Sequence, residues 1–325
     1  MIIISIFAQL CYTNIEIVKK RNLWIDTDAG TDDAIALIMA MRRDDINIVG
    51  VSTSGGNVPL SCVVQNVLYI KELCQHDAPV YVGAEQPLQR ILDTADFIHG
   101  KDGLGDIGLH LEGRTPDEGV AHHLLVDALS TYTDLEVVCL GPLTNIALAE
   151  QQKTGCLSRA KKIYVMGGLV ELPGNVTPLA EYNIWADPEA AQIVLHQLDN
   201  VIMIGWDTTL KSAPMYQDDM DDIRNIGTPL SAFAMDIQQV RLRWMEEAKE
   251  ETSLLLADAL AMAVVILPHS VSQEARYKMN VLSGFEDESK RGFIDCQASQ
   301  QPTSILHVSE VDREEYFQLV RDSLS

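Results

Sequence analysis

Aspartates gather near the start of the chain, where eight residues hold Asp26, Asp28, Asp32 and Asp33. They follow the apolar stretch Leu23 to Asp26, whose composition predicts a buried strand. Carboxylates at the carboxyl end of a strand in an open parallel sheet lie where ligands bind. A helix beginning near Thr31 would explain the last two aspartates, because its N-terminus favours negative charge, but not the first two. A hard cation would relieve their mutual repulsion, and Ca²⁺ takes roughly six to eight oxygen ligands.

Two other aspartate-rich motifs can be compared with this segment. An EF-hand loop starting at Asp26 would need Gly at its sixth position and Glu at its twelfth, where Thr31 and Leu37 stand. A phosphatase of the haloacid-dehalogenase type also begins with Asp-x-Asp after a strand, and would carry Thr or Val where Gly30 stands. The sequence therefore argues against an EF-hand and leaves an Asp-x-Asp phosphatase open.

Further polar motifs follow in order along the chain: Ser54-Gly55-Gly56-Asn57, His99 to Asp106, Leu140 to Asn145, Met166-Gly167-Gly168, Gly174-Asn175, Ala180 to Asn183, Asp187 to Ala190, and Ala257 to Ala261. Each motif alone is weak. Together with the early aspartates, this ordered set resembles the inosine-uridine nucleoside hydrolase family, from about Leu23 to the C-terminus. The resemblance implies hydrolysis of the N-glycosidic bond of ribonucleosides with one bound Ca²⁺.

The resemblance also implies roles for individual residues. Asp28, Asp33, Asp258 and the backbone carbonyl of Leu140 would hold the metal, and Asp28 would also be the general base. The ribose would be bound by Asp32, Asn57, Asn175, Glu181 and Asn183. Negative charge near the sugar suits the oxocarbenium-like transition state of glycoside hydrolysis. Because buried polar groups would lose their partners, deoxyribonucleosides should be poor substrates.

Two positions depart from the family pattern. Many members carry a His directly before the late Asp as the acid for the leaving base, and Ala257 stands there. His99 is the first candidate to replace it, and stacking of a purine on Trp244 is the second. A third hypothesis is a weakly active or non-catalytic nucleoside-binding protein. The other departure is Ala29, where the family usually has a Pro that presets the turn.

These residues must be positioned by alternating strands and helices. Short apolar strands are expected at 23–26, 46–53, 79–82, 135–140, 162–166 and 201–204, and helices at 32–43, 60–74, 118–130, 143–149, 188–195, 235–251, 254–266 and 311–324. Strands without polar alternation are typical of parallel sheets buried on both faces. The pattern predicts an α/β fold, an open, mostly parallel sheet with helices on both faces, as in the Rossmann-like nucleoside hydrolase fold.

Composition limits the class of protein. The 325 residues carry a formal net charge of −23, which disfavours nucleic acid as a partner. No apolar run reaches the ~20 residues of a membrane helix, so no membrane partner is expected. Six scattered cysteines without a CxxC pair favour a reduced, cytoplasmic setting. We expect an N-terminal extension at 1–22 that is disordered, one domain at 23–325, and a homodimer or homotetramer.

Overall fold

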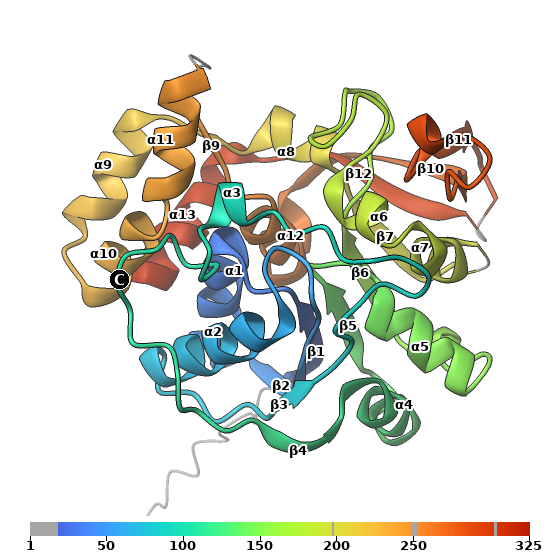
Figure 1. Cartoon of the computed structure of the whole chain (residues 1–325), viewed down its shortest axis with the longest axis horizontal. Coiled ribbons are helices and arrows are strands. Elements are labelled where there is room, and N and C mark those ends of the chain that lie inside the picture. Colours follow the sequence, from blue (N-terminus) through green and yellow to red (C-terminus); the bar gives the residue numbers. More distant parts are fainter. Residues whose placement is uncertain (1–18, 197, 249–252, 302–303) are drawn as a thin grey trace, which may run out of the picture.

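The computed structural model describes residues 19–196, 198–248, 253–301 and 304–325. A ten-stranded sheet runs through the molecule in the order β11-β10-β12-β7-β6-β5-β1-β2-β3-β4 (Figure 1). Its strands are β1 (Arg21–Thr27), β2 (Ile46–Thr53), β3 (Val80–Val82), β4 (Asp117–Val120), β5 (Glu136–Cys139), β6 (Lys162–Met166), β7 (Val201–Ile204), β10 (Val271–Val281), β11 (Ile294–Ala298) and β12 (Ile305–Val311). All neighbours from β12 to β4 pair in parallel. The predicted α/β class is confirmed.

Helices cover both faces of the sheet. Successive side chains of a strand point to opposite faces, so Leu23 and Ile25 join one hydrophobic cluster while Trp24 joins the other. The first cluster includes residues of α1 (Thr31–Met41), α2 (Leu60–Leu73), α8 (Trp206–Ser212), α9 (Gln217–Asn225), α10 (Pro229–Asp236), α11 (Gln239–Ala248), α12 (Ala257–Ile266) and α13 (Arg313–Leu324). The second includes residues of α4 (Ala121–Thr131), α5 (Thr144–Gln152), α6 (Tyr182–Ala186) and α7 (Pro188–Leu195).

Several predicted elements have different bounds in the structure. The predicted helix at 118–130 begins only at Ala121, because residues 117–120 pair with β3 as β4. The predicted helix at 235–251 is divided, since α10 ends at Asp236 and α11 begins at Gln239; residues 249–251 lie outside the described part. Leu254–Leu255 form β9, which pairs with β8 (Pro214–Met215), so α12 starts later than expected.

The antiparallel edge of the sheet was not predicted. β10 pairs antiparallel with both β11 and β12, and β12 joins β7 in parallel. Most side chains of β10 are exposed or half-buried, as in the stretch Ser272 to Arg276. An edge strand of this kind lacks the continuous apolar run that marks the central strands.

The start of the described chain also differs from expectation. β1 begins at Arg21, inside the predicted extension 1–22, whose residues 1–18 lie outside the described part. The Arg21 guanidinium bonds Glu136 of β5 at 2.5 Å and the carbonyl of Val265 at 2.7 Å, which ties this end of β1 to its surroundings. Within the described residues, no helix is both long and apolar enough to cross a membrane.

Candidate active site

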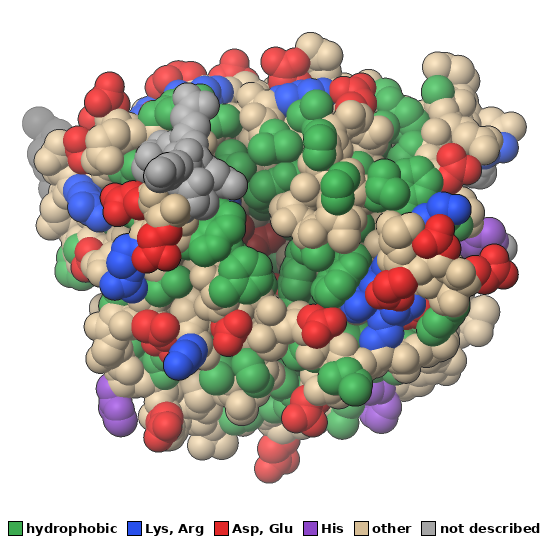
Figure 2. Space-filling view, turned by 45° about the horizontal axis from the view of Figure 1, so that its top comes forward, with side chains coloured by type: hydrophobic (Ala, Val, Ile, Leu, Met, Phe, Trp, Pro, Cys, Tyr) green, Lys and Arg blue, Asp and Glu red, His purple; other side chains and the backbone are tan. Residues whose placement is uncertain are grey.

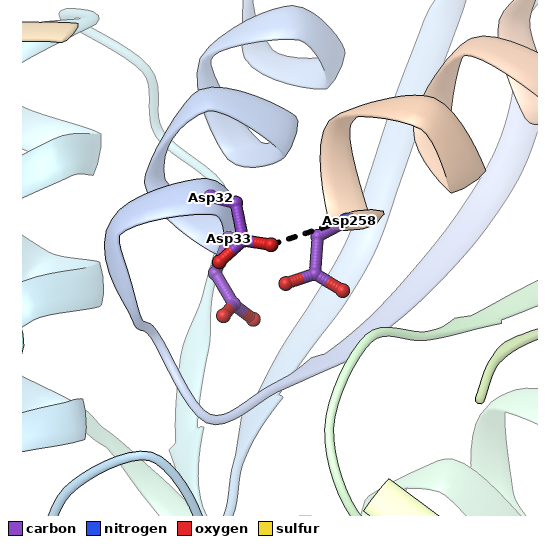
Figure 3. A group of neighbouring side chains, drawn as sticks. All are labelled: Asp32, Asp33 and Asp258. Carbon is purple, nitrogen blue, oxygen red and sulfur yellow. Dashed lines mark hydrogen bonds between the residues drawn. The ribbon is translucent and has the colours of Figure 1, made fainter. Parts of the chain in front are cut away.

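Two helices bring three aspartates together at the carboxyl ends of the strands. Asp32 and Asp33 open α1, directly after β1, and Asp258 lies in the first turn of α12. Their carboxylates are buried, lie within 4.8 Å of one another and face a common space (Figure 3). The predicted meeting of early and late aspartates therefore occurs, although Asp258 follows Asp32 by more than two hundred residues.

Asp32 holds the two helices in this arrangement. Its Oδ2 accepts hydrogen bonds from the backbone N–H groups of Ala257 at 3.1 Å and Asp258 at 3.5 Å. The N-cap residue of α12, Leu256, has no side-chain oxygen to offer these groups. A carboxylate from α1 therefore caps α12, and the positive end of the α12 dipole stabilises that carboxylate. The sequence assigned Asp32 to ribose, and this capping contact was not expected.

Asp28 is fully buried and lies near Asp32 and Asp33, whose charges act on its carboxylate. Its Oδ2 accepts from the backbone N–H of Asn57 at 2.7 Å, while the Asn57 side chain donates to Asp33 at 3.2 Å. Glycines flank the carboxylate on both sides: a Cβ at Gly56 would collide with Oδ2, and one at Gly141 would lie 2.8 Å from Oδ1. The ends of β2 and β5 can therefore approach Asp28 only because these two residues lack side chains.

Several acidic side chains lie close together around Asp33. Burial, followed by the charge of Asp33, raises the pKa of Asp28 well above its usual range, and the same two causes raise the pKa of Asp258. Burial also raises the pKa of Asp33, with Asp32 adding to the effect. In the described part of the chain, the buried Oδ1 atoms of Asp28 and Asp258 accept no hydrogen bond. Unpartnered, buried carboxylate oxygens fit a hard metal cation with oxygen ligands.

The remaining predicted ligand lies close by. Gly141, whose position presses on Asp28, follows Leu140, so the Leu140 backbone lies beside the aspartates. The Leu140 carbonyl accepts from Nδ2 of Asn183 at 2.7 Å. Asp26, by contrast, belongs to a different contact: its Oδ2 accepts from Ser52 and from Nδ2 of Asn145 at 2.8 Å. Asp26 was assigned no ligand role from the sequence, and these contacts give its carboxylate structural partners instead.

A cavity of about 730 Å³ opens above the aspartates. Figure 2 shows this hollow with acidic side chains on its floor and hydrophobic side chains around its mouth. All predicted ribose ligands line it, namely Asp32, Asn57, Asn175, Glu181 and Asn183, together with His99, Leu140 and Asp258. Such a volume suits a small-molecule ligand with a polar and an apolar part.

Local structure fixes two of these ligands more tightly than an extended segment would. Glu181 is the N-cap of the short helix α6, and its carboxylate accepts from the backbone N–H groups of Asn183, Ile184 and Gly168. Burial raises the pKa of Glu181 to about 7, and these hydrogen bonds oppose the rise. The amide nitrogen of Asn183 is used by Leu140 and Met166, which leaves its oxygen for a ligand.

His99 is buried beside the start of α1. Its Nδ1 accepts from the backbone N–H of Thr31 at 3.1 Å, so the proton of the neutral ring is on Nε2. Burial lowers the pKa of His99 to about 4, although nearby Asp32 opposes the shift. The side chain is therefore a neutral hydrogen-bond donor near neutral pH. This weighs against a protonated His99 as the acid for a leaving base.

Arg241 and Met245 line the cavity but were not singled out from the sequence, whereas Trp244 was expected there as a stacking residue. Arg241, Trp244 and Met245 of α11 line it, facing Phe97 of α3 (Asp96–His99). The Phe97 and Trp244 rings lie 6.4 Å apart. The helical spacing of three and four residues from Arg241 was the available signal, because it places these side chains on one face.

Ala29 has a conformation that its family position did not suggest. Its φ is +42°, in the left-handed region. Proline holds φ near about −65°, so it could not occupy this backbone without rearrangement. The expectation that Pro would preset the turn is wrong here. The Ala29 N–H instead bonds Thr27, and its carbonyl accepts from Asn66.

Comparisons with known proteins agree with this geometry. The family model described as inosine-uridine preferring nucleoside hydrolase matches residues 23–318. Uridine nucleosidase 1 of Arabidopsis thaliana is 34% identical over 253 residues, covering 77% of this chain and 75% of that protein. The pyrimidine-specific ribonucleoside hydrolase RihA of Salmonella paratyphi B is 35% identical over 227 residues, covering 69% and 72%. The solved structure of the plant nucleoside hydrolase PpNRh1 has a TM-score of 0.84 at 26% identity, covering 94% and 98%.

Proposed function

Since the chain belongs to the inosine-uridine preferring nucleoside hydrolase family, it is a hydrolase of N-ribosyl bonds, and we propose that it uses calcium to release base and ribose from ribonucleosides. The observation that carries the proposal is the meeting of Asp32, Asp33 and Asp258, of which Asp32 and Asp258 line the cavity of about 730 Å³. Because the family model matches residues 23–318, the alternative of an Asp-x-Asp phosphatase is no longer favoured.

The carboxylate group would hold the metal. Asp28, Asp33, Asp258 and the carbonyl of Leu140 supply only oxygen ligands, which is the preference of Ca²⁺. The unpartnered Oδ1 atoms of Asp28 and Asp258 support this assignment. When bound, the ion supplies a Lewis acid that lowers the pKa of water at the cavity floor.

The other residues act on the sugar and on the attacking water. Asp28 accepts the proton that the water loses, which is the role of a general base. Asp32, Asn57, Asn175, Glu181 and Asn183 bind the ribose hydroxyls from the walls of the cavity. The negative charge of the carboxylates favours the cationic sugar of the transition state. His99 donates from Nε2 to the substrate.

A reducing-sugar assay tests this function. The purified protein is incubated with uridine, inosine, cytidine or adenosine, after chelation and after adding back Ca²⁺ or Mg²⁺. We expect ribose release that disappears with chelator and returns best with Ca²⁺. Release that is unaffected by an exhaustive chelator treatment would contradict the metal assignment.

A second candidate is a nucleoside-binding protein with little or no turnover, favoured by Ala257 at the usual acid position. Calorimetric titration with uridine separates the two candidates, because a binder gives saturable heat without ribose release. A protein that neither binds nor cleaves any of the four nucleosides would contradict both.

We further propose one domain at 23–325, cytoplasmic location and assembly as a homodimer or homotetramer. Support for one domain comes from the sheet, whose strands are drawn from Arg21 through Val311. The five cysteines in the described part are free, which suits a reducing compartment. Light scattering on the purified protein tests the assembly, and a monomer at micromolar concentration would contradict it.

A further inference from the structure

A buried pair of side chains has no role in the proposed chemistry. Asp207 lies in the first turn of α8 and His307 lies on β12, and both are almost completely buried. Nε2 of His307 is 3.2 Å from Oδ1 of Asp207. Neither side chain is among the described residues that line the cavity. Any effect of this pair on the reaction must therefore pass through other residues.

The Asp207 carboxylate is ionised in this setting. Burial would raise the pKa of Asp207, but the hydrogen bond with His307 and two bonds from backbone N–H groups hold the pKa below its usual value. An ionised carboxylate only accepts hydrogen bonds, so Nε2 of His307 is the donor. This bond orients the carboxylate and leaves its other oxygen, Oδ2, to a different segment.

That segment is the loop 168–171, between β6 and α6. Oδ2 of Asp207 accepts from the backbone N–H groups of Val170 at 2.9 Å and Glu171 at 3.0 Å. The backbone N–H of Trp206, the residue before Asp207, donates to the carbonyl of Gly168 at 2.8 Å. The start of α8 therefore holds the loop through three hydrogen bonds.

The same loop contacts one of the proposed ribose ligands. The backbone N–H of Gly168 donates to Oε2 of Glu181 at 2.8 Å. The other hydrogen bonds to this carboxylate in the described part of the chain come from Asn183 and Ile184, which belong to α6 itself. Gly168 is thus the contact that ties Glu181 to the rest of the molecule, and a shift of the loop would move Glu181 relative to the aspartates.

We propose that Asp207 and His307 are positioning residues for the hydrolysis, which act through the loop 168–171 to set the place where Glu181 meets the ribose. This inference rests on the proposed ribonucleoside hydrolysis. A misplacement of about 1 Å can cost roughly 100-fold in rate, even when the change lies far from the reacting atoms. Because the pair acts on one ribose ligand, its loss should matter only while the hydroxyl that Glu181 binds is present.

The test measures nitrophenolate release from 4-nitrophenyl β-D-ribofuranoside and from its 2-, 3- and 5-deoxy analogues. Glu181→Gln first identifies the hydroxyl that Glu181 contacts, as the one missing from the analogue on which this variant loses least activity. We then expect His307→Leu to lower kcat/KM for the full riboside by about 30-fold, and for that analogue by less than about 3-fold. His307→Gln should recover most of the activity, because its amide N–H reaches as far as Nε2.

Two further variants complete the test, with folding checked by circular dichroism. His307→Asn keeps a polar side chain that stops short of Asp207, and it should show the same selective loss as His307→Leu. Glu136→Gln is the matched control, because it weakens the buried ion pair of Glu136 with Arg21, 2.5 Å long, at the amino ends of β5 and β1. It should lower Tm without changing the ratio of rates on the full riboside and the analogue.

The outcomes separate a positioning role from a structural one. Equal losses on the full riboside and the analogue in the folded His307 variants would overturn the proposal, and so would an unchanged rate of His307→Leu on the full riboside. Equal losses of Glu181→Gln on all analogues would remove the ribose contact on which the proposal depends. A wild type that releases no sugar from any riboside or nucleoside would instead contradict the proposed function itself.

Discussion

Asp258→Asn is expected to stabilise the metal-free protein while abolishing metal binding. The substitution keeps the size of the side chain and the backbone N–H that contacts Asp32. It removes one of three buried carboxylates that lie within 4.8 Å of one another. Stability and metal affinity should therefore change in opposite directions, which ordinary damage to a core residue would not produce.

The magnitude follows from the spacing. Two unit charges at 4.8 Å repel by about 3.5 kcal/mol at an effective dielectric constant of about 20. Asp258 faces both Asp32 and Asp33, but protonation already relieves part of the repulsion, so we expect a gain of about 2–4 kcal/mol. With an unfolding entropy of about 2.1 cal/mol/K per residue over 325 residues, this gain raises Tm by about 3–6 °C.

Thermal unfolding measured by circular dichroism at pH 8 provides the assay, with chelator and with excess Ca²⁺. The wild type should gain about 3 kcal/mol at one hundred times its Kd for Ca²⁺, whereas the variant should gain nothing. Asp127→Asn is the control, because Asp127 is exposed on α4 and its loss changes the net charge equally. If Asp258→Asn is no more stable than the wild type in chelator, the aspartates do not share one repulsive site.

Three other outcomes can be checked with the same protein. In chelator, the wild type should lose stability as pH rises above the ordinary aspartate pKa of 3.8 and through the raised pKa values of Asp28 and Asp258, because folding favours their protonated forms. Thermal melts at several pH values measure this loss, and Ca²⁺ should reduce the dependence of stability on pH. Asp28→Asn should lower turnover on uridine by more than about 100-fold, as general-base loss commonly does, and near-native turnover in initial-rate assays would refute the role. Replacing uridine by 2′-deoxyuridine should lower kcat/KM by roughly 10⁴-fold, and comparable rates would exclude a ribose-reading site.

The parallel part of the fold was predictable because its strands are short apolar runs separated by helical patterns. β2, β6 and β7 have the bounds expected from the sequence. β10 was missed because its exposed polar residues carry no continuous apolar signal. The break between α10 and α11 was missed as well. There Gln238 is buried and its side chain donates to the carbonyl of Thr31, a tertiary contact that no local pattern contains.

The candidate site was predictable to the extent that charge makes it conspicuous. Aspartates crowded after a strand repel one another, which predicts a shared cation site, and Asp33 does lie close to Asp258. The crowding of charge alone could not separate Asp26 from its neighbours, because its contacts come from Ser52 and Asn145 on other segments. It also could not place Arg241 at the cavity, because that depends on how α11 packs across from α3.

The capping of α12 by Asp32 has a consequence for how the enzyme matures during biosynthesis. The two partners of this contact, Asp32 and Ala257, are separated by 225 positions. A ribosome releases the early aspartates long before the late helix has been made, so a nascent chain carries only part of the aspartate site. A polypeptide halted before Ala257 would lack both the peptide groups that orient Asp32 and the carboxylate of Asp258. We therefore expect uptake of the ion to be a late step, because metal binding requires the first and last thirds of the polypeptide to be packed together.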